Sequence, residues 1–127
     1  MVRANPGRGF TVIELLVVLA AIGLLLAVSV PRYVQHVDTA REVALKQNLR
    51  AMREAIDKFY ADQARYPQAL DELVSRRYLR SVPVDPITER FDSWVPVAPA
   101  GGATGAVFDV RSGAPGPARD GTAYAVW

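Results

Sequence analysis

The sequence predicts an α+β fold, in which one long N-terminal helix packs on a short second helix and a small antiparallel β-sheet. Three features predict this fold. An apolar run from Phe10 to Val30 is long enough to cross a bilayer as a helix. A polar segment with helical periodicity follows this run directly. The rest of the chain contains short runs of β-type residues between loops that contain glycine and proline.

The apolar run contains only three polar residues, Thr11, Glu14 and Ser29. At about 1.5 Å per helical residue it spans roughly 30 Å, the thickness of the hydrocarbon core of a membrane. A buried helix of a soluble domain is a poor alternative, because a chain of 127 residues has one modest core. A secretory signal that is removed whole also fits poorly, because its apolar part is usually roughly 7–15 residues long and a small-residue cleavage pattern should follow. We therefore expect a transmembrane helix that stays attached.

Gly23 and Pro31 lie in the second half of this helix. Inside a helix a glycine costs about 1 kcal/mol relative to alanine and a proline about 3 kcal/mol, so the stretch between them is the weakest part. One interpretation is the ordinary tolerance of transmembrane helices for both residues. The interpretation that we favour is a helix that unwinds locally when it leaves lipid for a protein filament.

Beyond Pro31 the chain becomes polar but keeps the helical period. Its apolar positions mostly recur at three- and four-residue steps, and they are Val34, Val37, Leu45, Leu49, Met52, Ile56, Phe59 and Tyr60. The opposite face carries two i,i+4 pairs of favourable order, Glu42 with Lys46 and Glu54 with Lys58. The pattern predicts one helix from near Phe10 to about Arg65, half in the membrane and half amphipathic, which Pro67 ends.

The remaining residues, 66–127, are too few to be stable on a core of their own, so we expect them to pack on the apolar stripe within one continuous domain. A short second helix is predicted with its apolar residues at Leu70, Leu73, Val74 and Tyr78. Its charges suit the helix dipole, with Asp71 and Glu72 near its start and Arg76, Arg77 and Arg80 near its end.

Short strands are predicted after a loop that Pro83 and Pro86 mark. The predicted strands are Trp94–Val97, Val107–Val110 and Ala123–Val126. Pro96 places the first of them at a sheet edge or a bulge.

The stretch "GRGFTVIELLVVLAAIG" resembles the leader junction and N-terminal helix of type IV pilin-like proteins, which include the pseudopilins of type II secretion. The resemblance rests on Gly9, Phe10, Glu14, Gly23 and Pro31. It implies that a membrane peptidase cleaves after Gly9 on the cytoplasmic side and methylates Phe10 as the new N-terminal residue.

The resemblance also divides the chain into three parts, a cleaved leader at residues 1–9, a transmembrane and filament-core helix at 10–31, and a pilin-like globular domain at 32–127 that includes the second half of the long helix. Before assembly the protein is expected to cross the bacterial inner membrane once, with its N-terminus in the cytoplasm and its globular domain in the periplasm. Arg3 and Arg8 agree with this orientation under the positive-inside rule. After assembly it is expected in a periplasmic filament.

Glu14 is the acid of the apolar run, and intramembrane acids are by default functional and paired. It lies one helical turn beyond Phe10, so it can stay near the cytoplasmic interface before assembly. Cleavage after Gly9 creates a positive amine at Phe10, which in a filament of staggered helices can meet Glu14 of a neighbouring subunit. The alternative is that Glu14 merely marks the interfacial end of the helix.

The second half of the chain also resembles the family. "ARYP" and "YLRSVPVDP" are similar to the segment after the long helix in major pseudopilins, and "FDVRSG" and "DGTAYAVW" to their closing sheet and tail. Two departures matter. The acid-rich calcium loop is thin, because only Asp109 and Asp120 carry carboxylates after Asp92; we expect no cofactor, and these two are the candidate ligands should calcium bind. There is no cysteine, so the disulfide loop of many type IV pilins cannot form.

Charge and catalytic motifs argue against other classes. The fifteen basic and thirteen acidic residues become thirteen of each when Arg3 and Arg8 leave with the leader, which does not indicate nucleic-acid binding. We interpret the cluster Arg76, Arg77 and Arg80 as a solvated helix end rather than a contact for DNA or lipid headgroups. With no cysteine and one histidine, His36, neither a catalytic triad nor a zinc site is indicated, and we expect no enzyme.

We therefore expect a structural subunit of a type II secretion pseudopilus that drives protein export. The expected partners are further copies of the chain, other pseudopilins, the prepilin peptidase and an inner-membrane assembly platform. One alternative is a type IV minor pilin of a pilus or DNA-uptake machine. Another is a membrane-anchored binding module that never polymerises.

Overall fold

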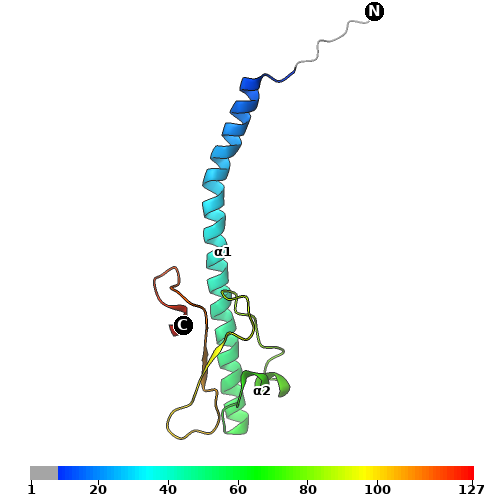
Figure 1. Cartoon of the computed structure of the whole chain (residues 1–127). Helices are drawn as coiled ribbons and strands as arrows, with labels where there is room; N and C mark the ends of the chain where they lie inside the picture. The colour runs from blue at the N-terminus through cyan, green and yellow to red at the C-terminus, as the bar shows by residue number, and fades with distance from the viewer. Residues whose placement is uncertain (1–8) are drawn as a thin grey trace, which may run out of the picture. The chain divides into compact units, whose positions relative to one another are not determined.

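The computed structural model describes residues 9–127. The elements follow in the order α1 (Val12–Gln63), α2 (Leu70–Ser75), β1 (Val95–Val97), β2 (Asp109–Arg111) and a 3₁₀ turn, η1 (Tyr124–Val126), as Figure 1 shows. The predicted α+β class is confirmed. The chain separates into two compact units, one up to Val37 and one from Asp38 to Trp127, and each contains part of α1.

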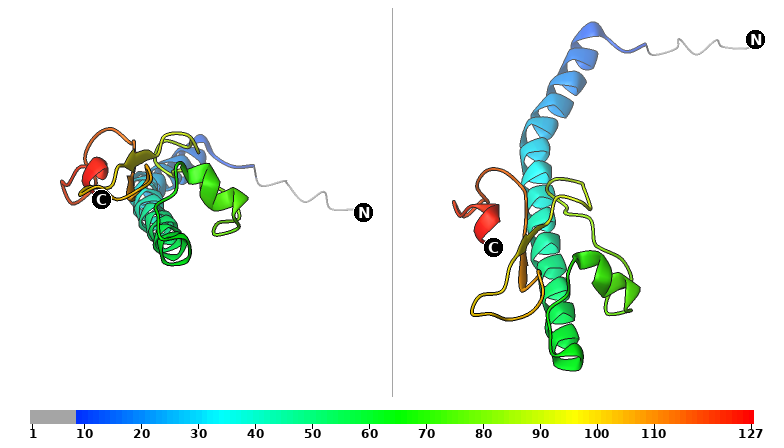
Figure 2. Two further views of the ribbon diagram at one scale, coloured as in Figure 1. Left: turned by 90° about the horizontal axis from the view of Figure 1, so that it is seen from below. Right: turned by 60° about the horizontal axis from the view of Figure 1, so that its bottom comes forward.

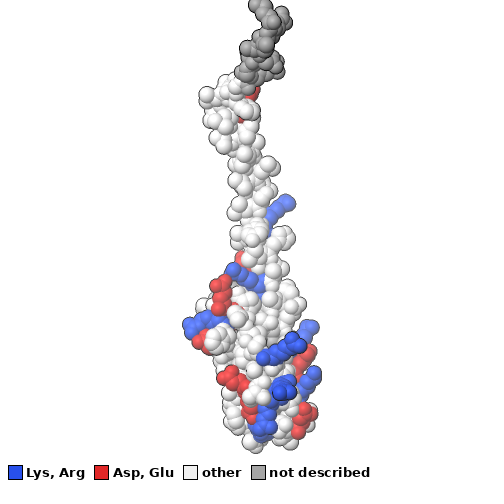
Figure 3. All heavy atoms as spheres, turned by 90° about the vertical axis from the view of Figure 1, so that its right-hand side faces the viewer, with Lys and Arg blue, Asp and Glu red and all other residues white. Residues whose placement is uncertain are grey.

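The first unit is the apolar part of α1. Every residue from 9 to 36 is exposed, and the helix runs without interruption through Gly23 and Pro31. Among the described residues, this is one helix long and apolar enough to cross a membrane. Figure 3 shows charged side chains gathered over the second unit and almost none over the apolar run. A helix that is apolar all round needs lipid or other helices around it.

The second unit has a core that is built on α1. The helix buries residues at three- and four-residue steps, namely Leu45, Leu49, Met52, Ala55, Ile56 and Phe59. Leu73 from α2 and Trp94, Val107 and Val110 from the strand region complete this core. The predicted stripe is thus confirmed in its second half, whereas Val34 and Tyr60 are exposed. Residues after α1 pack on the helix, as their small number requires.

The short elements lie on different sides of α1. In Figures 1 and 2, α2 lies on one side of the second half of the helix and the sheet and the C-terminal end of the chain lie on another. The two strands pair antiparallel, with Val95 opposite Arg111 and Val97 opposite Asp109. Pro96 fits because both strands of a two-stranded sheet are edges.

The prediction of a third strand at Ala123–Val126 is wrong. Tyr124–Val126 forms the 3₁₀ turn η1, and Ala123 makes only an isolated bridge with Pro117. A 3₁₀ turn brings residues three apart to the same side, and here it packs the rings of Tyr124 and Trp127 edge to face at 5.2 Å. The aromatic contact prevails over the alternating pattern that indicated a strand.

Both helices end earlier than predicted. The helix α1 stops at Gln63, because Ala64 takes a left-handed conformation (φ 54°) before Pro67 is reached. The helix α2 stops at Ser75, and Arg77 is left-handed (φ 65°) while the amides of Tyr78 and Leu79 both donate to the carbonyl of Leu73. The predicted arginines, Arg76, Arg77 and Arg80, therefore follow the helix instead of occupying its last turn.

Asp85, in the "VPVDP" stretch, is a fully buried carboxylate that joins two loops. The hydroxyl of Ser112 donates to Asp85 Oδ2 (2.5 Å), and the amide of Ile87 donates to Oδ1 (2.8 Å). Gly113 follows, where a Cβ atom would lie 2.0 Å from the carbonyl oxygen of Ser93. This close approach leaves no room for a side chain, so packing requires a glycine at position 113, directly after Ser112.

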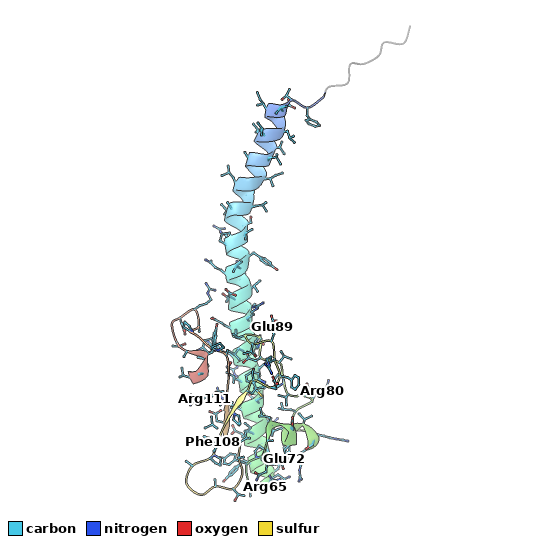
Figure 4. The ribbon with its side chains drawn as sticks, in the orientation of Figure 1. Arg65, Glu72, Arg80, Glu89, Phe108 and Arg111 are labelled. Atoms are coloured by element: carbon cyan, nitrogen blue, oxygen red, sulfur yellow. The ribbon has the colours of Figure 1, made fainter. Side chains whose placement is uncertain are left out.

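Glu72 ties the end of α1 to α2, and Figure 4 shows it facing Arg65. The guanidinium of Arg65 donates to both carboxylate oxygens, and the amide of Gln68 donates to Oε2 (2.7 Å). The hydrogen bond from Arg65, followed by that from Gln68, lowers the pKa of Glu72. The pair therefore favours the ionised carboxylate.

Replacing Glu72 by Gln should lower the melting temperature of the full chain in detergent by a few degrees at neutral pH. Because the pKa of Glu72 lies below its usual 4.5, its contribution to stability is complete above that pH and disappears as the pH falls through the lowered pKa. The difference between wild type and variant should therefore close in acid. Thermal unfolding followed by tryptophan fluorescence at about pH 7 and about pH 3 measures it.

Asp71→Asn is the matched control, since Asp71 is an exposed neighbouring acid whose side chain makes no hydrogen bond or ion pair within residues 9–127. Equal losses for the two variants at neutral pH, or a difference for Glu72→Gln that persists in acid, would contradict the assignment.

Candidate functional site

The first turn of α1 is capped by Thr11. The amide of Glu14 donates to Thr11 Oγ1 (3.1 Å), and the amide of Leu15 donates to the Thr11 carbonyl (3.2 Å) as the first bond of the helix. Thr11 is thus the N-cap and Glu14 the third helical residue, the positions of Thr and Glu in a capping box. The spacing T-x-x-E is the sequence signal of this cap, which the polarity of Thr11 alone does not reveal.

Glu14 lies in the first turn of α1. Negative charge is favourable there, because the unpaired amides of the first turn give the helix start a partial positive charge. An open apolar hollow lined by Phe10, Leu15 and Val18 borders the carboxylate. Glu14 therefore lies in the capped first turn of an apolar helix, and its side chain is exposed.

The predicted cleavage junction lies just before the cap. Gly9 and Phe10 are outside the helix and exposed, and the Phe10 ring is 90% exposed. The rest of the predicted leader, with Arg3 and Arg8, lies outside the described residues. The junction and Glu14 thus occupy one short stretch at the start of α1.

Gly23 and Pro31 both lie within continuous helix. A Cβ atom at Gly23 would meet nothing within 4 Å, so packing inside the single chain does not require glycine there. Local unwinding between these two residues stays a prediction.

The candidate calcium ligands, Asp109 and Asp120, are each engaged by protein donors. Asp109 Oδ1 accepts from Arg53 Nε (2.8 Å), and Asp120 Oδ1 accepts from the amide and the hydroxyl of Thr122 (2.9 and 2.6 Å). The hydroxyl of Thr122 is the main cause of a lowered pKa of Asp120. Calcium takes six to eight oxygen ligands, and within residues 9–127 no three acidic, histidine or cysteine side chains are grouped for a metal. These residues do not fit a calcium site.

The predicted i,i+4 ion pairs do not form within residues 9–127. Glu42 turns instead to the end of the chain, where its Oε1 accepts from the amide of Arg119 (2.8 Å) and the hydroxyl of Tyr124 (3.0 Å). Lys46 lies over the ring of Trp127, 4.6 Å from its centroid. Tertiary contacts thus replace the pair of Glu42 with Lys46, and such local pairs are worth little on an exposed helix face.

The comparisons with known proteins find type II secretion core proteins and type IV pilins. The profile of the prokaryotic N-terminal methylation motif matches residues 5–30. The chain is 32% identical over 95 residues to the type II secretion system core protein G of Klebsiella pneumoniae, covering 62% of this chain and 68% of that protein. The Pseudomonas aeruginosa protein of the same name is 33% identical over 94 residues, 61% of this chain and 66% of that protein.

A type IV pilin is also similar. The type IV major pilin protein PilA of Myxococcus xanthus is 36% identical over 72 residues, 56% of this chain and 33% of that protein. The chain thus spans a third of the length of this pilin and about two thirds of the length of the core G proteins. No solved structure matches significantly.

Replacing Thr11 by Val, which has nearly the same shape but no hydroxyl, should open the first turn of α1. A lost N-cap costs about 1–2 kcal/mol, so amide exchange at Glu14 should accelerate roughly 5- to 30-fold. Hydrogen-exchange NMR on the full chain in detergent micelles measures this rate. Thr11→Ser keeps the hydroxyl and should exchange like wild type. A Val variant that exchanges like the Ser variant would rule out the cap.

Proposed function

The chain belongs to the family of the type II secretion system core protein G, within the type IV pilin-like proteins, and from this premise we propose that it is a structural subunit of a secretion pseudopilus. It is inserted in the inner membrane, processed by the prepilin peptidase and polymerised into a short periplasmic filament that drives protein export. One observation carries the proposal. The apolar part of α1, up to residue 36, is exposed throughout, and Glu14 lies in its first turn, which Thr11 caps.

The exposed apolar surface supports both states of such a subunit. Residues 10–30 expose large apolar side chains in every direction. In a membrane, lipid covers them, and the continuous helix satisfies the backbone groups internally. In a filament, the same side chains of neighbouring copies replace the lipid. One surface thus serves the monomer and the polymer.

The orientation follows from the family and from charge. Arg3 and Arg8 precede the apolar run and support a cytoplasmic N-terminus under the positive-inside rule, which in this proposal puts the unit from Asp38 to Trp127 in the periplasm. The partners in this proposal are copies of the chain, other pseudopilins, the peptidase and an inner-membrane assembly platform. A catalytic role is not part of the proposal, and relatives carry the names of pilins and secretion core proteins.

A type IV minor pilin is the second candidate, which the match to the Myxococcus pilin favours. A membrane-anchored module that never polymerises is the remaining alternative. Sheared cell-surface and periplasmic fractions separate the three, because a pseudopilin assembles only with the secretion machine, a minor pilin co-purifies with pili, and an anchored module stays in the membrane fraction.

The mature protein should begin at Phe10 with a methylated amine. Replacing Gly9 by Leu should leave only precursor in the membrane, because the bulky side chain obstructs cleavage at the junction. Intact mass spectrometry of membrane-extracted protein shows both results. Gly23→Ala, which changes a glycine of the same helix remote from the junction, should be processed normally. A wild-type chain that still begins at Met1 in cells that process other pilins would refute the processing step.

Replacing Glu14 by Gln or Leu should give protein that inserts and is cleaved but does not enter filaments. The carboxylate of one subunit is proposed to pair with the Phe10 amine of its neighbour, and both variants remove the charge. Co-expression with wild type, followed by quantification of the variant in sheared filaments, should show at least a tenfold deficit.

Ser29→Ala is the control, because it removes another polar residue of the apolar run without removing charge. Incorporation of the Glu14 variants at the level of Ser29→Ala would defeat the pairing.

A further inference from the structure

Arg53 of α1 lies among oxygen atoms from two distant parts of the chain. Its Nε donates to Asp109 Oδ1 (2.8 Å), and its Nη2 donates to the carbonyls of Val110 (3.0 Å) and Trp127 (2.5 Å). Asp109 and Val110 belong to β2, whereas Trp127 lies at the far end of segment 112–127. One guanidinium therefore connects the helix, the sheet and this segment.

The acceptors around Arg53 are of the kind that calcium uses, a carboxylate and backbone carbonyls. A guanidinium presents fixed donors and keeps its positive charge at any physiological pH. A metal ion and the guanidinium cannot share these oxygens, because both are cations. Asp120, the other candidate ligand, is satisfied within its own turn by Thr122.

Segment 112–127 is attached to α1 mainly by polar and ring contacts. Within the segment only small side chains are buried, those of Ser112, Ala114 and Ala118. Further contacts with α1 are the bonds to Glu42, the bond from Arg119 Nη1 to Thr39 Oγ1 and the contact between Lys46 and the Trp127 ring. Arg111 of β2, labelled in Figure 4, donates to the Ala125 carbonyl (3.3 Å). The rings of Tyr124 and Trp127 are partly buried against the core. Segments with few buried apolar contacts open at lower free energy than the core, so a single strong contact has a large effect.

We propose that Arg53 is a built-in cation that holds segment 112–127 on α1 through its bonds to Asp109, Val110 and Trp127. The globular unit then closes without a metal ion. This inference concerns the folded second unit, so it stands or falls independently of filament assembly.

The test is limited trypsin digestion of the full chain in detergent, with cleavage after Arg119 followed by mass spectrometry. When opening and closing are fast, the cleavage rate tracks the population of the open segment. Arg53→Ala should raise the rate at Arg119 at least tenfold. Arg53→Lys, which keeps the charge but not the planar fork, should give an intermediate rate. Arg50→Ala changes an exposed arginine of the same helix whose side chain makes no hydrogen bond or ion pair within residues 9–127, and it should behave like wild type.

The second part of the experiment repeats the digestion of the wild-type chain in calcium chloride and in a chelator. The rate at Arg119, divided by the rate at which the same trypsin cleaves an unstructured arginine peptide, should be the same in both, within twofold. Slower cleavage of wild type in calcium by more than this would overturn the proposal, as would equal rates for Arg53→Ala and Arg50→Ala. Asp109→Asn guards against misfolding of the Arg53 variant. It should also accelerate cleavage, and a rate equal to wild type would count against the proposal.

Discussion

The folded unit depends on the apolar face that α1 presents between Leu45 and Phe59. Six of the ten side chains in the core come from this one helix. The other elements are a helix of six residues and two strands of three residues, which are too short to be stable alone. Each of them therefore exists because α1 offers a rigid apolar surface, and changes at this surface affect every element of the unit.

Polar contacts determine how the loops and short elements are arranged on the apolar face of α1. Glu72 fixes the turn between the helices, Asp85 fixes the loop before the sheet, and Arg53 fixes the end of the chain. Each of these groups has its partners on another part of the chain, and within residues 9–127 no buried side-chain nitrogen or oxygen lacks a hydrogen bond. The apolar core provides most of the attraction, while these charged groups determine which loop lies where. This division is typical of small domains, in which short elements have little propensity of their own.

Period and composition were sufficient to predict the long helix, its buried stripe and the first two strands, because these depend on spacings that the chain itself displays. The tail was mispredicted as a strand at Ala123–Val126, since the alternation "AYAV" does not reveal that the ring of Tyr124 packs edge to face on that of Trp127. The local pair of Glu42 with Lys46 failed for a related reason, because residues 77 and 82 positions away compete for Glu42. Thr11 could have been found from its spacing to Glu14, whereas Arg53 could not, since its partners are set by tertiary structure alone.

The cap at Thr11 has a consequence for the bond between Gly9 and Phe10. Peptidases bind their substrates as extended backbone, and a helix whose amides and carbonyls bond to one another cannot enter such a cleft. By starting the helix at Val12, the threonine hydroxyl leaves the preceding residues without helical bonds. For the cleavage that we propose, the helix start at Val12 therefore limits the extended backbone to the residues before it, since those beyond it are hydrogen-bonded as helix.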